Sequence, residues 1–314
     1  MNSPGKFEED QFRYISDWGF DFVRLPLNYT FWIDDNDPFK INDNKLAFVD
    51  EAVEWGQKYG LHIEMNFHRA PGFSVAEDRE EPFSLWKDQE AQEAFRLHWM
   101  TMTRRYQGIS SDRLSFNLIN EPYDITEADH NRVLLPAMKE IAALDQERLI
   151  ILDGLNWGTV PNESILKEAE GVKMAQSCRS YAPHPFTHYL AEWSNPDYSQ
   201  PEPEWPFRHY KWESEYWDRE RIFDYFAIWA KFADEHNVGV HCGEGGAHNR
   251  TPHAPVLRWM EDCLDALKTY NIGFALWNLD GSFGVLNSGR KDVAYEDYYG
   301  HKLDRKMLEL LQKY

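Results

Sequence analysis

The sequence has few cysteines, a shortage of basic residues and no long apolar run. Its three cysteines, Cys178, Cys242 and Cys263, are an odd number at no metal-like spacing among 314 residues. This count excludes a disulfide-rich scaffold and favours buried thiols. Lys and Arg total 33 against 53 Asp and Glu, a net charge of -20. That balance argues against nucleic acid and anionic membrane as partners.

No apolar run approaches the roughly 20 residues of a membrane span. The first residues, M-N-S-P-G-K, lack the apolar segment of a signal peptide. A natural start further upstream would permit secretion, so both a cytoplasmic and a secreted location stay open. A neutral ligand fits the charge balance better. The 13 Trp and 16 Tyr supply broad amphipathic rings that suit sugar faces as well as protein cores.

Strand-like apolar runs alternate with helical patterns along the whole chain. This alternation, with strands too apolar for a half-exposed sheet, predicts a parallel sheet covered by helices, an α/β fold of the TIM (β/α)8-barrel type. No change in composition divides residues 1–314, so we expect one catalytic barrel domain. The predicted strands are 19–27, 61–69, 114–119, 148–154, 171–178, 237–246 and 271–279. The predicted helices are 7–18, 45–59, 89–107, 129–144, 164–169, 218–236, 255–270 and 303–313.

Seven strands are one fewer than an eightfold barrel needs. The chain opens on a helix, and the six residues before Phe7, which include Pro4 and Gly5, cannot make the first strand. Two sheet edges would then face each other across a gap and leave backbone groups unpaired. The segment after Asp280 is rich in glycine and is a poor replacement strand. We therefore expect a homo-oligomer that shields the gap.

Carboxyl groups stand where two of the predicted strands end. Asn120 and Glu121 follow strand 114–119, and Pro122 stops it. Glu244 lies at the end of strand 237–246, three strands further along. Because the carboxyl ends of parallel barrel strands meet at one face, the two carboxyls should face a shared pocket. Glycoside hydrolysis needs such a pair, one acid to protonate the leaving oxygen and another to attack or to activate water.

The longest stretch predicted to be non-helical is 179–217, and it is unusually aromatic. It holds Trp193, Trp205, Trp212 and Trp217 together with several prolines. A long aromatic loop after a strand end is typical of a functional loop. We expect this loop to form one wall of a cleft. At least one of Trp193, Trp205 and Trp212 should stack on a sugar, and Trp205 is the first candidate.

Six motifs occur in order along nearly the whole chain. They are V-R-L-P (23–26), F-H-R-A-P-G (67–72), N-L-I-N-E-P (117–122), Y-A-P-H-P-F-T-H (181–188), G-E-G-G (243–246) and A-L-W-N (275–278). Together they resemble glycoside hydrolase family 5, the large cellulase family of retaining (β/α)8-barrel enzymes. Asn-Glu-Pro at a strand end is the strongest mark of this resemblance.

The resemblance implies Glu121 as general acid/base and Glu244 as nucleophile. The other roles that it implies are contacts to the sugar from Asn120, His68 and Trp277, and contacts to Glu244 from Arg24 and Tyr181.

Two positions depart from the family pattern. Arg179 stands where the family usually has a histidine two residues before the tyrosine, and a guanidinium cannot exchange protons near neutral pH. His184 or His188 would then fill the gap. Gly245 replaces the usual aromatic residue after the nucleophile, which we expect to enlarge or loosen that side of the pocket.

The function that the resemblance implies is retaining hydrolysis of β-glycosidic bonds in a β-glucan, with an endo-β-1,4-glucanase as the leading interpretation. The partner is a β-linked oligo- or polysaccharide, and neither metal nor organic cofactor is implied. A β-mannan or other hemicellulose enzyme and an exo-acting β-glycosidase are alternatives, because loops rather than motifs shape the subsites. A carbohydrate-binding barrel with impaired catalysis is the alternative from another class.

Overall fold

The computed structural model describes residues 7–76, 81–212 and 214–314, and the chain falls into two compact units. The first unit ends at Ser177, and the second runs from Cys178 to Tyr314. One sheet has the strand order β1-β2-β4-β5-β6-β9-β10. Strand β6 (Met174–Ser180) crosses the boundary between the units.

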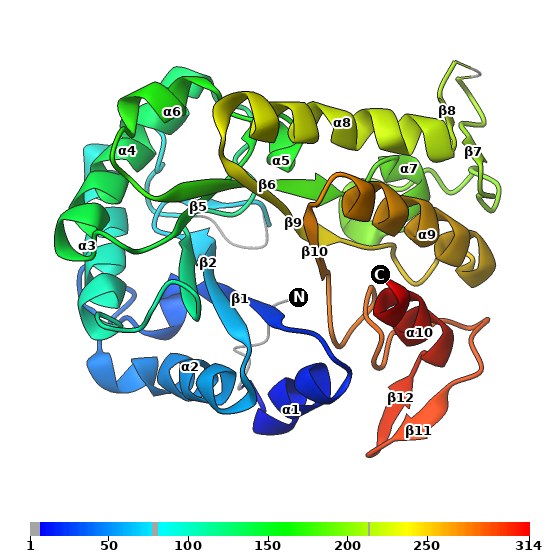
Figure 1. The fold of residues 1–314 in the computed structure, drawn as a ribbon, viewed down its shortest axis with the longest axis horizontal. Helices are drawn as coiled ribbons and strands as arrows, with labels where there is room; N and C mark the ends of the chain where they lie inside the picture. The colour runs from blue at the N-terminus through cyan, green and yellow to red at the C-terminus, as the bar shows by residue number, and fades with distance from the viewer. Residues whose placement is uncertain (1–6, 77–80, 213) are drawn as a thin grey trace. The chain divides into compact units, whose positions relative to one another are not determined.

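The first unit alternates strands with helices that cover the outer side of the strands (Figure 1). Parallel pairing joins β1 to β2, β2 to β4, β4 to β5 and β5 to β6. The other strands of this unit are β1 (Phe22–Asn28), β2 (His62–Ala70), β3 (Phe73–Ser74), β4 (Leu114–Asn117) and β5 (Ile150–Asp153). Its helices are α1 (Glu9–Asp17), η1 (Tyr29–Phe31), η2 (Asp43–Leu46), α2 (Ala47–Tyr59), α3 (Gln89–Arg105), α4 (Glu127–Leu144), α5 (Leu155–Gly158) and α6 (Ser164–Glu168).

Local sequence signals set the ends of these helices. Helix α2 ends at Gly60, which takes the left-handed conformation (φ 74°) that glycine adopts without steric cost. Helix α4 begins with a capping box between Thr126 and Asp129. Between helix and sheet, the ring of Trp99 stacks on that of Phe67 with 4.1 Å between centroids. Both rings are fully buried, so α3 is packed firmly against β2.

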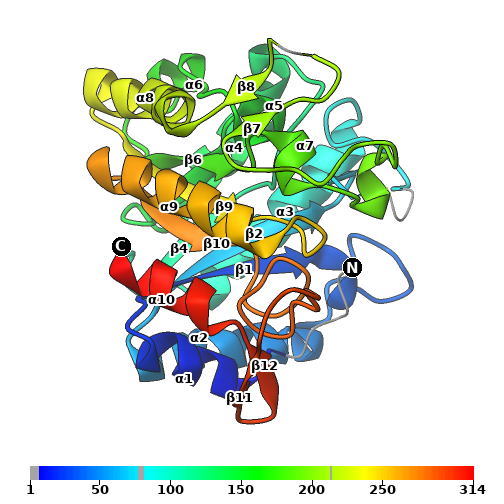
Figure 2. The same ribbon diagram turned by 90° about the vertical axis from the view of Figure 1, so that its right-hand side faces the viewer.

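The second unit continues the alternation after β6. Helix α8 (Arg219–His236) starts at Asp218, whose side chain accepts the backbone N–H of Arg221. Strand β9 (Gly239–Gly245) pairs in parallel with β10 (Gly273–Leu276), and α9 (His253–Thr269) connects them. The antiparallel hairpin of β11 (Glu296–Tyr298) and β12 (His301–Leu303) comes directly before α10 (Arg305–Lys313) (Figure 2).

The stretch 179–217 is not the irregular loop that the sequence predicts. It contains the short helices α7 (His184–Thr187) and η3 (Glu192–Ser194) and a hairpin of β7 (Phe207–Arg208) and β8 (Tyr216–Trp217). These elements have two to four residues each, which is too short for a hydrophobic period to reveal.

The seven long strands predicted from the sequence are all present, within a few residues of the expected bounds. The eight predicted helices are present as well. Strand β1 lies at one end of the strand order, and no strand precedes it between residue 7 and Phe22. The shortfall of one strand is therefore confirmed for the part of the chain that the structure describes. The homo-oligomer inferred from it stays a prediction.

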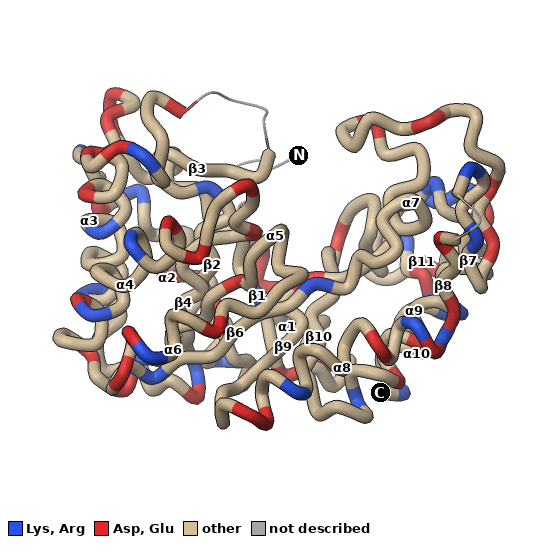
Figure 3. The backbone as a smooth tube through the Cα atoms, turned by 90° about the horizontal axis from the view of Figure 1, so that it is seen from above, with Lys and Arg blue, Asp and Glu red and all other residues tan. Residues whose placement is uncertain are grey.

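Basic and acidic residues alternate along the helices of each unit (Figure 3). Arg105 of α3 pairs with Asp50 of α2 at 2.5 Å, and Arg219 of α8 pairs with Asp265 of α9. Exposed pairs of this kind stabilise a fold by at most about 1 kcal/mol each. Among the described helices, none has the length and apolar character needed to cross a bilayer.

A buried histidine makes the first unit sensitive to acid. His98 of α3 is fully buried, and its Nδ1 accepts the indole N–H of Trp32 at 2.8 Å. Its other ring nitrogen, Nε2, donates to the carbonyl of Pro38 at 2.8 Å. This arrangement requires the neutral ring, and burial lowers the pKa of His98 from 6.5 to about 4.

We expect the free energy of unfolding to fall as the pH drops from 6.5 to about 4. In that window the unfolded chain binds a proton at His98 that the folded chain does not, so acid favours unfolding by about 3 kcal/mol in total. Urea unfolding of the wild type and of His98→Gln at pH 7 and pH 4.5 measures this contribution. The variant should be less stable at pH 7 and should lose less on acidification, whereas parallel losses would contradict the assignment.

Candidate active site

The first half of the candidate site lies where β4 ends. The backbone N–H of Asn120 donates to the carbonyl of Phe67 at 3.0 Å, which continues the sheet one step past the strand. Glu121 then takes a left-handed conformation (φ 46°), and its N–H donates to Oδ2 of Asp153 at 2.8 Å. A residue other than glycine keeps this conformation only where its surroundings impose it. Asp153, at the end of β5, is one of those surroundings.

Arg24 is the centre of a buried polar network in the same half. Its Nε donates to Glu64 at 3.0 Å, and its Nη2 donates to Oδ1 of Asn117 at 2.9 Å and to Oδ1 of Asn120 at 2.8 Å. The same nitrogen lies 3.7 Å from Oδ2 of Asp153. Because the Asn120 amide oxygen faces the guanidinium, the orientation of this amide is fixed. A buried guanidinium is well suited to this because its several donors have fixed directions.

His68 extends the network at the end of β2. Its Nδ1 is 3.2 Å from Oδ1 of Asn66, and the Asn66 amide donates to Asn117 at 2.8 Å. The side chain is mostly buried, at 8% exposure. Arg24, His68 and Asn120, which the sequence placed at three separate strand ends, are thus linked through Asn66 and Asn117.

Sequence reasoning missed two residues in this half. Asp153 ends the predicted strand 148–154, and the strand-end rule that singled out Glu121 would have found it. Trp157 follows four residues later in α5, where 49% of its surface is exposed. Its ring stacks on Tyr123 with 4.9 Å between centroids and 8° between planes. Nothing local in the sequence distinguishes this tryptophan from a core residue.

The second half of the site is built around Glu244 near the end of β9. Its side chain is almost fully buried. The hydroxyl of Tyr181 donates to its Oε2 at 3.1 Å, and Nη2 of Arg179 lies 3.9 Å from its Oε1. Each carboxylate oxygen therefore has a donor or a positive charge beside it. A buried carboxylate with such partners is favoured in its ionised form.

Arg179 is itself buried, at 1% exposure, and is anchored by its neighbours. Its Nη1 donates to the carbonyl of Cys178 at 3.1 Å. The hydroxyl of Tyr225 donates to the backbone carbonyl of Arg179 at 2.9 Å. Burial raises the pKa of Tyr225 well above its usual value, so the phenol keeps the proton it donates. Glu244 lies within ion-pair distance of this guanidinium, as a buried arginine requires.

His188 is one of the two histidines expected to compensate for Arg179, and it lies beside Tyr181. Its ring meets the ring of Tyr181 edge-on at 5.3 Å. Burial and the neighbouring imidazoles of His184 and His248 hold its pKa well below the usual value. His184 stacks on the other side of this arrangement, with its ring 4.1 Å from that of His188.

Gly245 does not loosen the pocket, contrary to expectation. A Cβ at this position would lie 2.6 Å from a ring carbon of Phe274 and 2.6 Å from Cβ of Ser180. The place of a side chain is thus already filled by neighbouring strands. Trp277 continues the pairing of β10 with β9, since its backbone N–H donates to the carbonyl of Gly245 at 2.8 Å. Its own side chain is half-buried.

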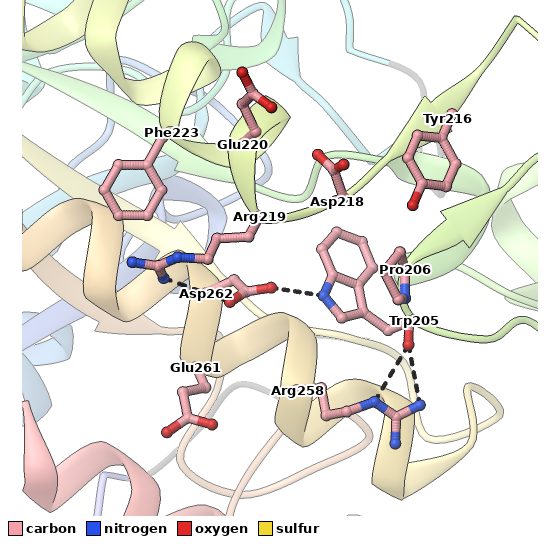
Figure 4. A pocket seen from close by; sticks show the side chains of 10 residues that line it. All are labelled: Trp205, Pro206, Tyr216, Asp218, Arg219, Glu220, Phe223, Arg258, Glu261 and Asp262. Carbon is pink, nitrogen blue, oxygen red and sulfur yellow. Dashed lines mark hydrogen bonds and ion pairs between the residues drawn. The ribbon is translucent and has the colours of Figure 1, made fainter.

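Trp205 is a packing residue rather than a sugar platform. Only 5% of its surface is exposed, and its indole N–H donates to Asp262 at 2.8 Å. Its ring packs 5.4 Å from that of Phe186. Figure 4 shows it lining a surface pocket of about 740 Å³ with residues of α8 and α9. That lining includes neither Glu244 nor Tyr181, so we remove Trp205 from the candidate site.

The described residues contain no group of three or more His, Cys, Asp or Glu side chains that could hold a metal ion.

The fold and the strand-end acids define a glycoside hydrolase of the (β/α)8-barrel type, and comparison with known proteins identifies its family. Residues 3–282 match the model of the cellulase family, glycosyl hydrolase family 5. The chain belongs to this family, which confirms the resemblance seen in the motifs.

Individual relatives agree with the family assignment. A solved structure titled as a glycoside hydrolase is 32% identical, covers 99% of this chain and 94% of its own, and superposes with a TM-score of 0.91. Endoglucanase C of Acetivibrio thermocellus is 24% identical over 92% of this chain and 88% of its own length. Cellodextrinase A of Ruminococcus flavefaciens is 28% identical over 81% of this chain and 73% of its own.

We expect Trp205→Ala to lower the free energy of unfolding by about 3 to 5 kcal/mol, because it removes a buried ring and the hydrogen bond from its indole to Oδ2 of Asp262. The Michaelis constant on cello-oligosaccharides should stay within about twofold of the wild-type value, since the buried Trp205 ring does not contact the substrate. Urea unfolding and steady-state kinetics measure the two effects. Trp212→Ala, which removes a ring that is 60% exposed, is the control for stability. A raised Michaelis constant with unchanged stability would restore the platform interpretation.

Proposed function

We propose that this protein is a retaining endo-β-1,4-glucanase in which Glu244 is the nucleophile and Glu121 the general acid/base. The observation that carries the proposal is the pairing of the buried Glu244 carboxylate with Tyr181 and Arg179. Relatives named endoglucanase and cellodextrinase support the choice of a β-glucan as substrate. The proposal treats residues 1–314 as one catalytic domain.

The reaction takes two steps. In the first, a carboxylate oxygen of Glu244 attacks the anomeric carbon, the glycosidic bond breaks, and Glu121 gives its proton to the leaving oxygen. In the second, Glu121 as carboxylate takes a proton from water, the water oxygen attacks the anomeric carbon, and the bond to Glu244 breaks. Two inversions leave the product in the β configuration.

The surroundings of Glu244 suit a nucleophile. Arg179 carries its charge at every pH at which the enzyme would work, so the carboxylate beside it stays ionised between turnovers. The hydrogen bond from Tyr181 to Oε2 is charge-assisted while Glu244 is ionised. It weakens as this oxygen loses its charge by forming the bond to the sugar, so the tyrosine can release the oxygen at that point. Arg179, which stands where the family usually has a histidine, thus favours the ionised form of Glu244 by a permanent positive charge.

The remaining residues have supporting roles in this proposal. Arg24 fixes the amide of Asn120, which then contacts the sugar 2-hydroxyl. His68 and Trp277 contact the sugar in the cleaved subsite, and His184 supports Tyr181 through His188. Rigid support of this kind holds reacting groups in the productive geometry.

A substrate panel with anomeric analysis tests the activity directly. We expect hydrolysis of β-1,4-glucan and cello-oligosaccharides, with the β anomer seen first by NMR before mutarotation. Glu244→Gln should reduce turnover of every substrate to background, because the amide keeps the shape and removes the nucleophile's charge. Glu204→Gln, which changes an acid that is 80% exposed, is the matched control and should retain activity.

The same panel separates the alternatives. Preference for mannan or xylan would show that the substrate is a hemicellulose and not a β-glucan. Release of single sugars from chain ends would indicate an exo-acting enzyme. Binding without turnover would indicate a carbohydrate-binding barrel with impaired catalysis. An α anomer as first product would contradict the retaining mechanism.

The loss of activity caused by Glu121→Gln should depend on the pKa of the leaving group. We expect a loss of about 10² to 10⁴-fold for cello-oligosaccharides, whose alcohol leaving group needs a proton, and a much smaller loss for the glycosylation step of activated aryl β-glycosides. A plot of kcat/KM against leaving-group pKa should therefore be steeper for the variant. Equal losses across the series would contradict the role of Glu121 as general acid.

A further inference from the structure

The backbone of Glu121 has a conformation that the local sequence disfavours. Its φ is 46°, in the left-handed region where a residue with a Cβ atom is sterically strained. Pro122 follows it, and the residue before a proline is pushed toward the extended region. Two local preferences therefore oppose the observed conformation. Contacts from elsewhere in the fold have to offset both of them.

Asp153 supplies a contact of this kind from the end of β5. Its side chain is fully buried, and its Oδ2 accepts the backbone N–H of Glu121 at 2.8 Å. Its Oδ1 accepts the side-chain amide of Asn117 at 3.0 Å. The guanidinium of Arg24 lies 3.7 Å from Oδ2 and offsets the charge of the buried carboxylate. Both oxygens of Asp153 thus face a hydrogen-bond donor.

These neighbours require an acceptor at both oxygens of residue 153. The amide of Asn117 has a fixed orientation, because its Oδ1 accepts from Arg24 at 2.9 Å and from Asn66 at 2.8 Å. Its NH₂ group must therefore face Asp153, and the backbone N–H of Glu121 can only donate. An ionised carboxylate is an acceptor at both oxygens. An asparagine of the same shape would direct its own NH₂ group at one of the two donors in either orientation.

The backbone conformation of Glu121 determines where its carboxyl group lies. A general acid/base must come within hydrogen-bond reach of the leaving oxygen and later of the attacking water, and a misplacement of about 1 Å can slow the reaction about 100-fold. We propose that Asp153 is a positioning residue that acts through Glu121. Its carboxylate holds the backbone of the general acid/base in the left-handed conformation that proton transfer requires. This proposal rests on the assignment of Glu121 as the general acid/base.

Substrates that differ in their leaving group test the positioning role. For Asp153→Asn we expect kcat/KM on cellotetraose to fall by about 10 to 100-fold, because a displaced carboxyl delivers its proton poorly. On a dinitrophenyl β-cellobioside, whose leaving group needs no proton, kcat/KM should change by less than about threefold. In the Glu121→Gln background, Asp153→Asn should change cellotetraose hydrolysis by less than about twofold, since the group through which Asp153 acts is already gone.

Asp145→Asn is the matched control. Asp145 precedes β5, and its Oδ2 accepts from the buried guanidinium of Arg148 at 2.8 Å. This variant should have a lower melting temperature and an unchanged ratio of kcat/KM between the two substrates. The melting temperature of each variant shows whether it is folded. If Asp153→Asn does not fold, Asp153→Ser takes its place with the same selective loss expected, because a hydroxyl can still accept from one of the two donors.

Equal losses on the two substrates, or a loss that adds to that of Glu121→Gln, would indicate a structural role and overturn the proposal. A crystal structure of Asp153→Asn should show Glu121 outside the left-handed region, and an unchanged φ would count against the proposal as well. A wild type that cleaves no β-glucan, or a Glu121→Gln variant that is impaired equally on both substrates, would overturn the proposed function instead. The crystal structure would then still decide whether Asp153 holds the backbone of Glu121.

Discussion

The buried guanidinium of Arg24 is the interaction on which the first half of the site depends. Its donors contact Glu64, Asn117 and Asn120, and its charge lies close to Asp153. Burial of an arginine is unfavourable unless carboxylates and oxygen acceptors surround it. The four strands β1, β2, β4 and β5 must therefore stay in register for the network to exist. Glu121 benefits from this register because Asp153 also accepts its backbone N–H.

The second half uses another buried arginine for a different purpose. Arg179 lies beside Glu244 in a place where the family usually has a histidine, so a titrating neighbour is replaced by one with a permanent charge. The ionisation of Glu244 then does not depend on a group that loses its proton near neutral pH. The tight packing around Gly245 leaves the carboxylate's position equally constrained.

The tryptophans show how far composition can be interpreted. Thirteen of them in one chain suggested sugar binding, and the long aromatic loop pointed to Trp205. That ring is buried against Phe186 and Asp262, whereas the exposed ring beside Glu121 belongs to Trp157, in a turn of four residues. A tryptophan serves a core or a ligand equally well, and only the packing around it separates the two uses.

Much of the architecture follows from the sequence alone. Hydrophobic periods located the seven long strands and eight helices, because these patterns reflect burial on one or both sides of an element. Strand ends located Asn120, Glu121 and Glu244, since parallel strands present their carboxyl ends together. The motifs of the family resemblance added Arg24 and His68. The short helix α7 and the β7–β8 hairpin escaped detection, as elements of two to four residues carry no period.

Contacts between segments that are distant in sequence were decided by the tertiary structure alone. The support of Glu121 by Asp153, the anchoring of Arg179 by Tyr225, and the filled space at Gly245 all join residues more than 25 positions apart. The exposure of Trp157 and the burial of Trp205 depend in the same way on neighbours that no local pattern names. Residue types and their spacing determined which chemistry the chain carries. Long-range packing decided which side chains are held in place for that chemistry and which rings remain exposed.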